Sequence, residues 1–127
     1  MLEGFHLTSH VPTRVDKPWG YEIIWAHTDR YVGKILHIFK NQALSYQYHR
    51  VKDETIYLWS GLLELEIESD GRRETLQLKP GDRFHINPGM KHRMTALEEC
   101  DVLEASTPEL DDVVRLEDRY GRVGAKS

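Results

Sequence analysis

The sequence contains a single cysteine, Cys100, among its 127 residues. An internal disulfide therefore cannot form, and a lone thiol is typical of a protein kept in a reducing compartment. Long apolar runs are also missing. The first segment, MLEGFHLTSHVPTR, has no hydrophobic stretch of the signal-peptide type, and nothing approaches the length of a membrane span. From these absences we expect a cytoplasmic protein.

An excess of basic residues is lacking as well. Asp and Glu outnumber Lys and Arg by 21 to 17, and the formal net charge is −4. Because nucleic acids and anionic membranes attract proteins through clustered positive charge, we expect neither as a partner. The hydrophobic content of 39% and the charged content of 30% are ordinary for a globular protein, and the length suits one domain.

Helical periodicity is scarce, and short alternating segments separated by Gly, Pro and Asp take its place. In the clearest one, 62–68, leucines and an isoleucine alternate with glutamates, which predicts a strand with one face in the core. Further strands are predicted over 21–25, 31–40, 44–49, 54–59, 72–78, 83–86, 92–97 and 102–106, with turns at Ser60-Gly61, Asp70-Gly71 and Asn87-Pro88-Gly89. Many short strands with regular turns predict an all-β, antiparallel sandwich or jelly-roll barrel.

We divide the chain into an N-terminal arm (1–16), a barrel (17–107) and a C-terminal tail (108–127) packed on or near the barrel. His6 and His10 in the arm lack the same-face spacing of metal ligands, so we expect no metal role for them. The tail is charged, and we predict a short helical turn over 110–115.

Two polar stretches carry residues with metal-ligand chemistry. In NQALSYQYHRVKDETIYLWSG, Gln47 and His49 are two apart, so their side chains share one face of a strand. Glu54 follows after a short polar turn. In GDRFHINPGMKH, an Asn-Pro-Gly turn leads to His92. Each of these residues alone would more often be a surface or hydrogen-bonded group. Together, an amide oxygen, two imidazoles and a carboxylate suit a borderline divalent cation inside the mouth of a small β-barrel.

The two stretches resemble the two sequence motifs of the cupin superfamily. Matching positions are His49, Glu54, Gly61, Gly81, Gly89 and His92. Positions that depart from the motifs are Asn41, Gln47, Asn87 and Ala96. The resemblance implies a cupin double-stranded β-helix, which is an antiparallel jelly-roll barrel, and a metal held by Gln47, His49, Glu54 and His92.

Within the cupins, the chain most resembles the C-terminal domain of type II mannose-6-phosphate isomerases. The shared segments are KPWGYE, QALSYQYH and VRLEDRYGR, which span most of the chain. The Gln-x-His form of the metal motif is itself a feature of phosphomannose isomerases. One departure is the segment Arg50-Val51-Lys52-Asp53, where the family commonly carries a run of His followed by Arg.

This resemblance implies a metal-dependent aldose–ketose isomerase of the mannose-6-phosphate type, with a Lewis-acid divalent metal. Zinc is expected first, with manganese, nickel or iron as alternatives. The neutral amide of Gln47 is a harder and weaker donor than imidazole, which favours isomerase over dioxygenase chemistry.

The motif does not identify the catalytic base. Lys34, His37 and His85 are candidates, and each could equally be a packed or surface residue. For the phosphate, the candidates are Arg119, in the shared VRLEDRYGR segment, and Lys91. The alternative for Arg119 is a salt bridge that anchors the tail. Strand alternation turns Lys91 away from the His92 side, so a surface role is open for it too.

Two further functions stay open: a metal-binding cupin acting on another small molecule, and a non-catalytic sugar-binding cupin. A homodimer is expected in each case, because short barrels of this class expose apolar strand edges that pairing covers.

Overall fold

The structure is a computed structural model that describes residues 11–126, so His6 and His10 lie outside the described residues. Within that range the chain forms ten strands and no helix. The strands are β1 (Thr13–Lys17), β2 (Gly20–His27), β3 (Val32–Ile38), β4 (Tyr46–Tyr48), β5 (Glu54–Ser69), β6 (Arg72–Leu78), β7 (Arg83–Ile86), β8 (His92–Ser106), β9 (Val113–Glu117) and β10 (Gly124–Lys126). All pairs are antiparallel, and the predicted all-β class is confirmed.

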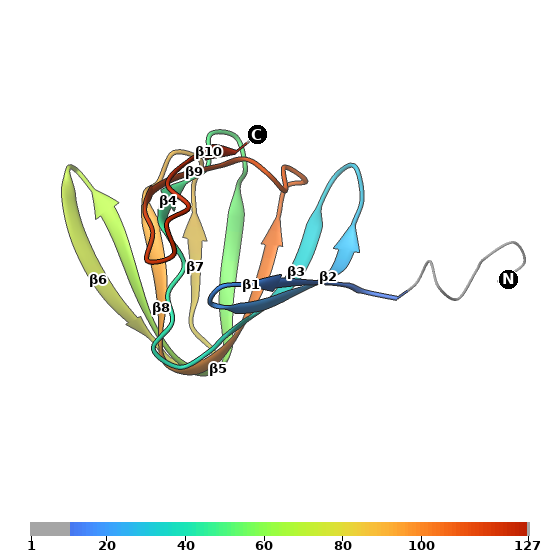
Figure 1. Cartoon of the computed structure of the whole chain (residues 1–127), viewed down its shortest axis with the longest axis horizontal. Coiled ribbons are helices and arrows are strands. Elements are labelled where there is room, and N and C mark those ends of the chain that lie inside the picture. Colours follow the sequence, from blue (N-terminus) through green and yellow to red (C-terminus); the bar gives the residue numbers. More distant parts are fainter. Residues whose placement is uncertain (1–10, 127) are drawn as a thin grey trace, which may run out of the picture.

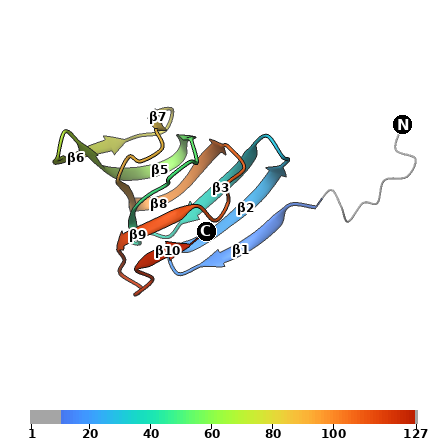
Figure 2. The ribbon, with the colours of Figure 1, turned by 90° about the horizontal axis from the view of Figure 1, so that it is seen from above.

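The sheet curls into a half-barrel built around its two longest strands, β5 and β8. Along one path the strand order is β1-β2-β3-β8-β4-β9-β10, while β5 pairs with β6, β7 and β8. In Figure 1, β5 and β8 descend, turn at the bottom of the view and rise again, so the sheet has a U shape. Figure 2, from above, shows β9 and β10 facing β3 and β8 across the interior. The space between them holds the candidate site.

The bend of the U lies at Gly61, where the sequence predicted a turn between two strands. That prediction is wrong, because β5 runs through Gly61 and keeps its pairing with β8 across three register shifts between Leu58 and Leu63. Gly61 has a φ of 94°, and a Cβ there would lie 2.2 Å from the carbonyl oxygen of Glu99. Glycine therefore allows a bulge that bends the strand without ending it. The predicted strands 92–97 and 102–106 likewise belong to one strand, β8.

The predicted helical turn over 110–115 is also wrong, because Val113–Glu117 forms β9. This strand pairs with β4 and β10, which satisfies its backbone, and its two adjacent valines favour an extended conformation. At the other end of the chain, β1 (Thr13–Lys17) begins in the segment predicted as an arm (1–16) and ends at the first residue of the predicted barrel. This segment is polar, and it forms a strand because its backbone pairs with β2 rather than because of an alternating apolar pattern.

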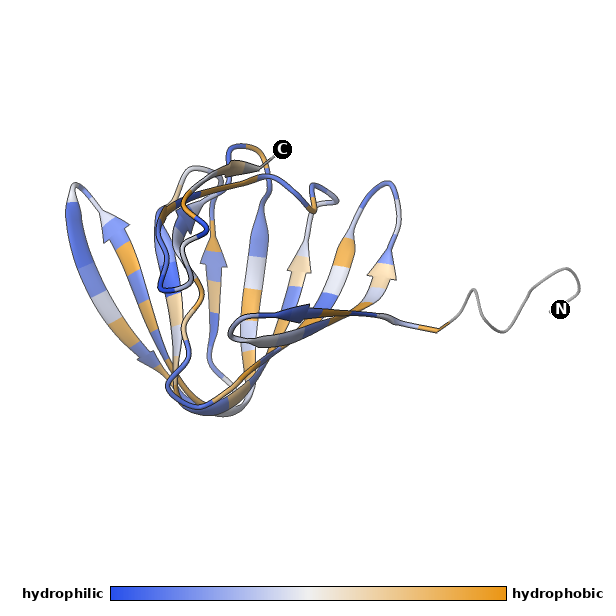
Figure 3. Ribbon diagram, in the orientation of Figure 1, coloured by the Kyte–Doolittle hydropathy of each residue, from blue (hydrophilic) through white to orange (hydrophobic). Residues whose placement is uncertain are grey.

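The core lies on the concave side of the sheet. Leu63 and Leu65 are 0% exposed and Ile67 is 8% exposed, so the predicted inward face of this strand is confirmed. Figure 3 shows the alternation of polar and apolar bands along β5 and β6. Burying each such side chain contributes about 1.5–3 kcal/mol to the stability of the folded chain. None of the described residues forms a helix with the length and apolar character needed to cross a membrane.

Candidate metal centre

Three of the four predicted metal ligands meet at the open end of the half-barrel. The Nε2 atoms of His49 and His92 each lie 3.5 Å from Oε1 of Glu54. The two imidazole centroids are 5.3 Å apart, and one potential ligand atom from each residue lies within 4.8 Å of the others. All three side chains are buried. A compact set of two nitrogens and a carboxylate has the spacing of a divalent metal site.

The bend in the sheet is what brings these residues together. Glu54, at the start of β5, pairs with Ser106, whereas His92, at the start of β8, pairs with Ile67 near the end of β5. In a flat ladder these two ends would be about 40 Å apart, at about 3.3 Å per residue. The site therefore depends on the curvature introduced at Gly61.

Backbone carbonyls set the tautomer of both histidines. Nδ1 of His49 lies 2.6 Å from the carbonyl oxygen of Asp112, and Nδ1 of His92 lies 2.9 Å from that of Met90. A carbonyl oxygen only accepts, so each Nδ1 carries the proton and each Nε2 presents a lone pair. Both Nε2 atoms are buried without a hydrogen-bond partner. Two lone pairs turned towards a carboxylate are stabilised by a cation between them, so these residues fit a bound divalent metal.

The loop between His49 and Glu54 is held by the side chain of Asp112. Its carboxylate accepts hydrogen bonds from the backbone N–H groups of Arg50, Val51 and Lys52, at 3.2, 2.7 and 2.9 Å. Burial alone would raise the pKa of Asp112, but these N–H groups outweigh burial and lower it. The same residue thus positions His49 through its carbonyl and the following loop through its carboxylate.

Gln47, the fourth predicted ligand, lies on β4 and lines the same cavity. Its Oε1 accepts a hydrogen bond of 2.5 Å from Oγ of Ser45. An amide oxygen has two lone pairs, so one remains for a cation while Ser45 orients the group.

A buried lysine keeps the glutamate ionised. Nζ of Lys52 lies 2.9 Å from Oε2 of Glu54 and 3.0 Å from Oε2 of Glu104, and all three residues are buried. Burial alone would lower the pKa of Lys52, but Glu104 and Glu54 together raise it above its ordinary value. Burial alone would raise the pKa of Glu54, yet the positive charge of Lys52 holds it well below the ordinary value. Glu54 is therefore a carboxylate, the form that binds a metal.

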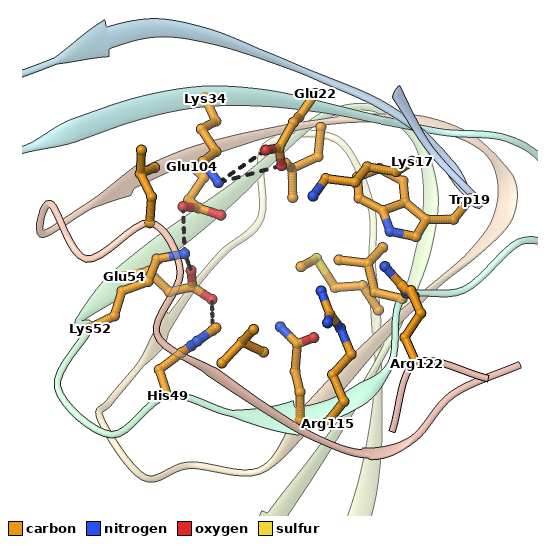
Figure 4. A pocket seen from close by; sticks show the side chains of 16 residues that line it. Lys17, Trp19, Glu22, Lys34, His49, Lys52, Glu54, Glu104, Arg115 and Arg122 are labelled. Carbon is orange, nitrogen blue, oxygen red and sulfur yellow. Dashed lines mark hydrogen bonds and ion pairs between the residues drawn. The ribbon is translucent and has the colours of Figure 1, made fainter. Parts of the chain in front are cut away.

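The cavity beside this cluster has a volume of about 80 Å³ and two chemically different sides. In Figure 4, His49, Glu54, Lys52 and Glu104 lie along one side, with the buried pair Glu22 and Lys34 next to them. Nζ of Lys34 is 3.4 Å from both carboxylate oxygens of Glu22.

The opposite side of the cavity is basic and carries Lys17, Arg115 and Arg122. Asp118 binds the guanidinium of Arg122 at 2.9 and 3.0 Å. Nε of Arg115 is buried without a hydrogen-bond partner. Burial, followed by the positive charge of Arg122, lowers the pKa of Arg115. A guanidinium in this setting gains from a bound anion.

Of the three candidate bases, Lys34 lines this cavity, whereas His37 and His85 lie on the convex face of the sheet. His37 contacts Asp101 and Glu99, at 2.7 and 2.6 Å. His85 is half exposed, and its Nε2 lies 2.6 Å from Asp53. Each histidine is the chain neighbour of a buried residue, Leu36 for His37 and Ile86 for His85. Because side chains alternate along a strand, both imidazoles point to the outer face, away from the candidate metal ligands.

The two candidate phosphate contacts also lie elsewhere. Nη1 of exposed Arg119 donates to the carbonyl oxygen of Asn41 at 2.8 Å, and Nζ of Lys91 lies 3.4 Å from Glu68. Neither is among the residues that line the cavity. The sequence reasoning missed the cavity-lining charges Lys17, Glu22, Lys52, Glu104, Arg115 and Arg122. The position of Glu104 could have been predicted, because it lies two residues after apolar Val102 and strand alternation therefore points both side chains inward.

A curled antiparallel half-barrel with two buried histidines and a buried glutamate at its open end is a β-fold with a site that could hold a metal. The cupin domain family model matches residues 35–105, and the chain belongs to this family. Its sequence is 34% identical over 119 residues to mannose-1-phosphate guanylyltransferase of Escherichia coli K12, a match that covers 89% of this chain and 24% of that protein. The enzyme ManC of Salmonella typhimurium is 33% identical over 120 residues, which cover 90% and 24% of the two chains.

The chain thus spans about a quarter of the length of these curated relatives. The resemblance seen in the sequence is confirmed as homology to the C-terminal region of this enzyme type. Among solved structures, KdgF from Halomonas sp. has a TM-score of 0.68 and 26% identity, covering 85% of this chain and 96% of KdgF. Oxalate decarboxylase from Bacillus subtilis has a TM-score of 0.70 at 17% identity, covering 88% of this chain and 31% of that one. The second likeness supports the fold alone.

Proposed function

We propose that this protein is a metal-dependent aldose–ketose isomerase acting on a hexose phosphate of the mannose 6-phosphate type. The observation that carries the proposal is the two-sided cavity, with His49 and Glu54 on one side and two arginines across from them. In a hexose 6-phosphate, the reacting carbons C1 and C2 and the phosphate also lie at opposite ends of the molecule. The homology to mannose-1-phosphate guanylyltransferases supports a mannose-derived substrate.

His49, Glu54 and His92 would hold the metal, with Gln47 as a fourth ligand from β4. When bound, a divalent cation would supply Lewis-acid polarisation of the sugar carbonyl and its neighbouring hydroxyl. Zinc fits the mixed nitrogen and oxygen ligand set, and manganese, nickel and iron are the alternatives for the test. Lys52 contacts Oε2 of Glu54, the oxygen other than the one that faces the two histidines, and keeps the carboxylate ionised.

Arg115 and Arg122 would bind the phosphate. Arg115 has an unpartnered buried Nε, and both guanidinium groups line the cavity. They would take the role that the sequence reasoning proposed for Arg119 and Lys91. The cavity volume of about 80 Å³ suits the reacting end of the substrate rather than the whole molecule. The phosphate would therefore lie towards the mouth, where charge-assisted hydrogen bonds from arginine fix its position.

Lys34 and Glu22 would move the proton. They form the buried ion pair nearest to the Glu104 side of the cavity, and Lys34 is the one candidate base that lines it. The Glu22 carboxylate would take the proton from C2 and return it to C1, while the Lys34 ammonium would give a proton to O1 and take one from O2, which interconverts aldose and ketose. Burial keeps bulk water away from the proton during the transfer.

The decisive experiment is a mannose 6-phosphate to fructose 6-phosphate assay on protein loaded in turn with zinc, manganese, nickel and iron. Turnover with at least one metal is expected. Arg115→Met should raise the KM for the phosphorylated sugar by about 10–100-fold, as expected for loss of a charge-assisted bond worth about 1.5–3 kcal/mol. Arg119→Met is the matched control and should leave KM unchanged. Absence of turnover with every metal would contradict the proposal.

A second candidate is a sugar-phosphate-binding cupin without catalysis, which the basic side of the cavity, with Arg115 and Arg122, would support by itself. Calorimetry with mannose 6-phosphate would then show binding that Arg115→Met weakens, while the assay shows no turnover. We further propose a cytoplasmic location, which the buried free thiol of Cys100 supports. Subcellular fractionation would test it.

A further inference from the structure

The convex face of the sheet carries a row of apolar side chains that runs across four strands. Ile23 on β2 pairs with Ile35 on β3, which pairs with Leu103 on β8, which pairs with Tyr57 on β5. Residues opposite one another in neighbouring strands share one face, so the row is continuous. In the described part of the chain no strand packs over it, since β4, β9 and β10 lie on the concave side.

Two tryptophans stand on either side of this row. Trp25 is 60% exposed and Trp59 is 64% exposed, although large aromatic side chains are on average highly buried. A hollow of about 440 Å³ lies beside Trp59, lined by Tyr21, Ile23, Ile35, Asp101 and Leu103. A second hollow, of about 400 Å³, lies beside Trp25 and is lined by Gly33, Thr55 and Ala105 among others. The face thus has both protruding aromatic rings and recesses.

Charges of both signs border the same face. Arg14 lies over the ring of Tyr21, with its Cζ 3.9 Å from the ring centroid. Glu99 and Asp101 lie nearby, on either side of His37. A face with both protrusions and recesses, and both cations and carboxylates, can match a copy of itself. Self-complementarity of this kind is what a two-fold symmetric interface requires.

We propose that this convex face is a homodimer interface, in which a second copy of the chain packs face to face across a two-fold axis. Each Trp59 enters the hollow beside the apolar row of the other copy. The exposed parts of the aromatic side chains and the half-buried aliphatic row together offer roughly 500–600 Å² per copy, and the bordering charged residues extend this to the about 600 Å² per partner at which standard interfaces begin. The two metal cavities, on the concave sides, stay accessible in this dimer.

Pairing through strand edges, which the sequence suggested, is less favourable. The exposed edge strand β6 carries Arg72, Arg73 and Glu74 in succession, and all three are exposed. Charged residues on an edge oppose the addition of another strand. This edge is therefore a poorer surface for association than the apolar face.

Light scattering coupled to size-exclusion chromatography, at 10–100 μM protein, tests this interface. The wild-type chain should have about 30 kDa, twice its mass of 14.9 kDa. Ile35→Glu and Trp59→Glu should each elute at the monomer mass, with circular dichroism and metal content unchanged. Val123→Glu is the matched control, because Val123 is also 64% exposed but lies between β9 and β10, which pair with none of the four strands of the apolar row. It should remain dimeric.

Three outcomes would overturn the proposal: a wild-type monomer at 100 μM, dimers that persist in both face variants, or a control that dissociates equally. A variant that lacks residues 1–10 separates the dimer from a second explanation, in which this segment of the same chain covers the face. The proposed interface predicts that the shortened chain is still a dimer. A wild-type monomer that dimerises only after the deletion would assign the face to residues 1–10 instead.

Discussion

Glu54 and His92 lie at opposite ends of the paired strands β5 and β8, and yet Oε1 of Glu54 is 3.5 Å from Nε2 of His92. The sheet curls back between them, so the candidate metal ligands and the bend are parts of one structural feature. A change at the bend should therefore reach the site, and a change at the site should leave the bend intact.

Replacing a ligand should remove the metal without unfolding the barrel. We expect His49→Ala and His92→Ala each to weaken divalent-metal affinity by more than about 100-fold, because loss of an outer hydrogen-bond partner alone costs about 10–100-fold. Metal analysis after dialysis measures the effect. His85→Ala, on the convex face, is the control and should retain the wild-type metal content. Equal metal content in all four proteins would contradict the site.

Removing the buried lysine should destabilise the metal-free protein. Lys52→Met leaves Glu54 and Glu104 buried without their shared cation, and we expect the free energy of unfolding to fall by about 3–5 kcal/mol. Urea denaturation in the presence of a chelator measures it. In Lys79→Met, the matched control, the lost pair with Asp82 is exposed at 3.7 Å, so the change should stay within about 1 kcal/mol. A loss below about 1 kcal/mol for Lys52→Met would show that Lys52 does not stabilise the fold through Glu54 and Glu104.

Gly61 and Gly71 give a matched test of the bend. Both have positive φ, 94° and 75°, but a Cβ at Gly61 meets the carbonyl oxygen of Glu99 at 2.2 Å, whereas one at Gly71 meets nothing within 4 Å. Gly71→Ala should cost about 1–2 kcal/mol for the left-handed conformation alone. Gly61→Ala should cost clearly more and also lower metal affinity, because the strand must shift at the bend. Similar losses in the two variants, with metal affinity retained, would separate the bend from the site.

His37 should titrate above its ordinary range. Its ring stacks on Tyr21 at 4.8 Å and lies between Asp101 and Glu99, while Oγ of Ser60 donates to Asp101. Burial by itself would lower the pKa of His37, but the hydrogen bonds and charges of Asp101 and Glu99 raise it above 6.5. The stability gained from the charged ring is therefore complete below pH 6.5 and is lost as the pH rises through the folded-state pKa.

Nuclear magnetic resonance titration of the imidazole protons measures this pKa directly. The Asp101→Asn variant should lower the pKa of His37 towards 6.5, and His37→Gln should flatten the pH dependence of unfolding across the same window. A wild-type His37 that titrates at or below 6.5 would contradict the arrangement.

Local sequence patterns determined much of this protein. The alternation over 62–68 predicted the inward row of Leu63, Leu65 and Ile67, because side-chain direction in a strand follows from its period of two. The spacing of His49 and Glu54 and the Pro-Gly turn before His92 are local features, and the resemblance of both stretches to the cupin motifs predicted that they share one site. The sequence did not predict that β5 is continuous, because Ser60-Gly61 is typical of a turn but forms a bulge within the strand.

Only the tertiary structure decided which charges face the cavity. Arg115 and Arg119 are four residues apart in one polar segment, and Lys34 and His37 lie on one strand, yet one member of each pair lines the cavity and the other does not. Alternation puts Lys34 and His37 on opposite faces of β3, but which face lines the cavity depends on the curl of the sheet, and the direction of Arg115 depends on the path of the tail across the open end. Those features are settled by packing between segments distant in sequence, which local periodicity does not encode.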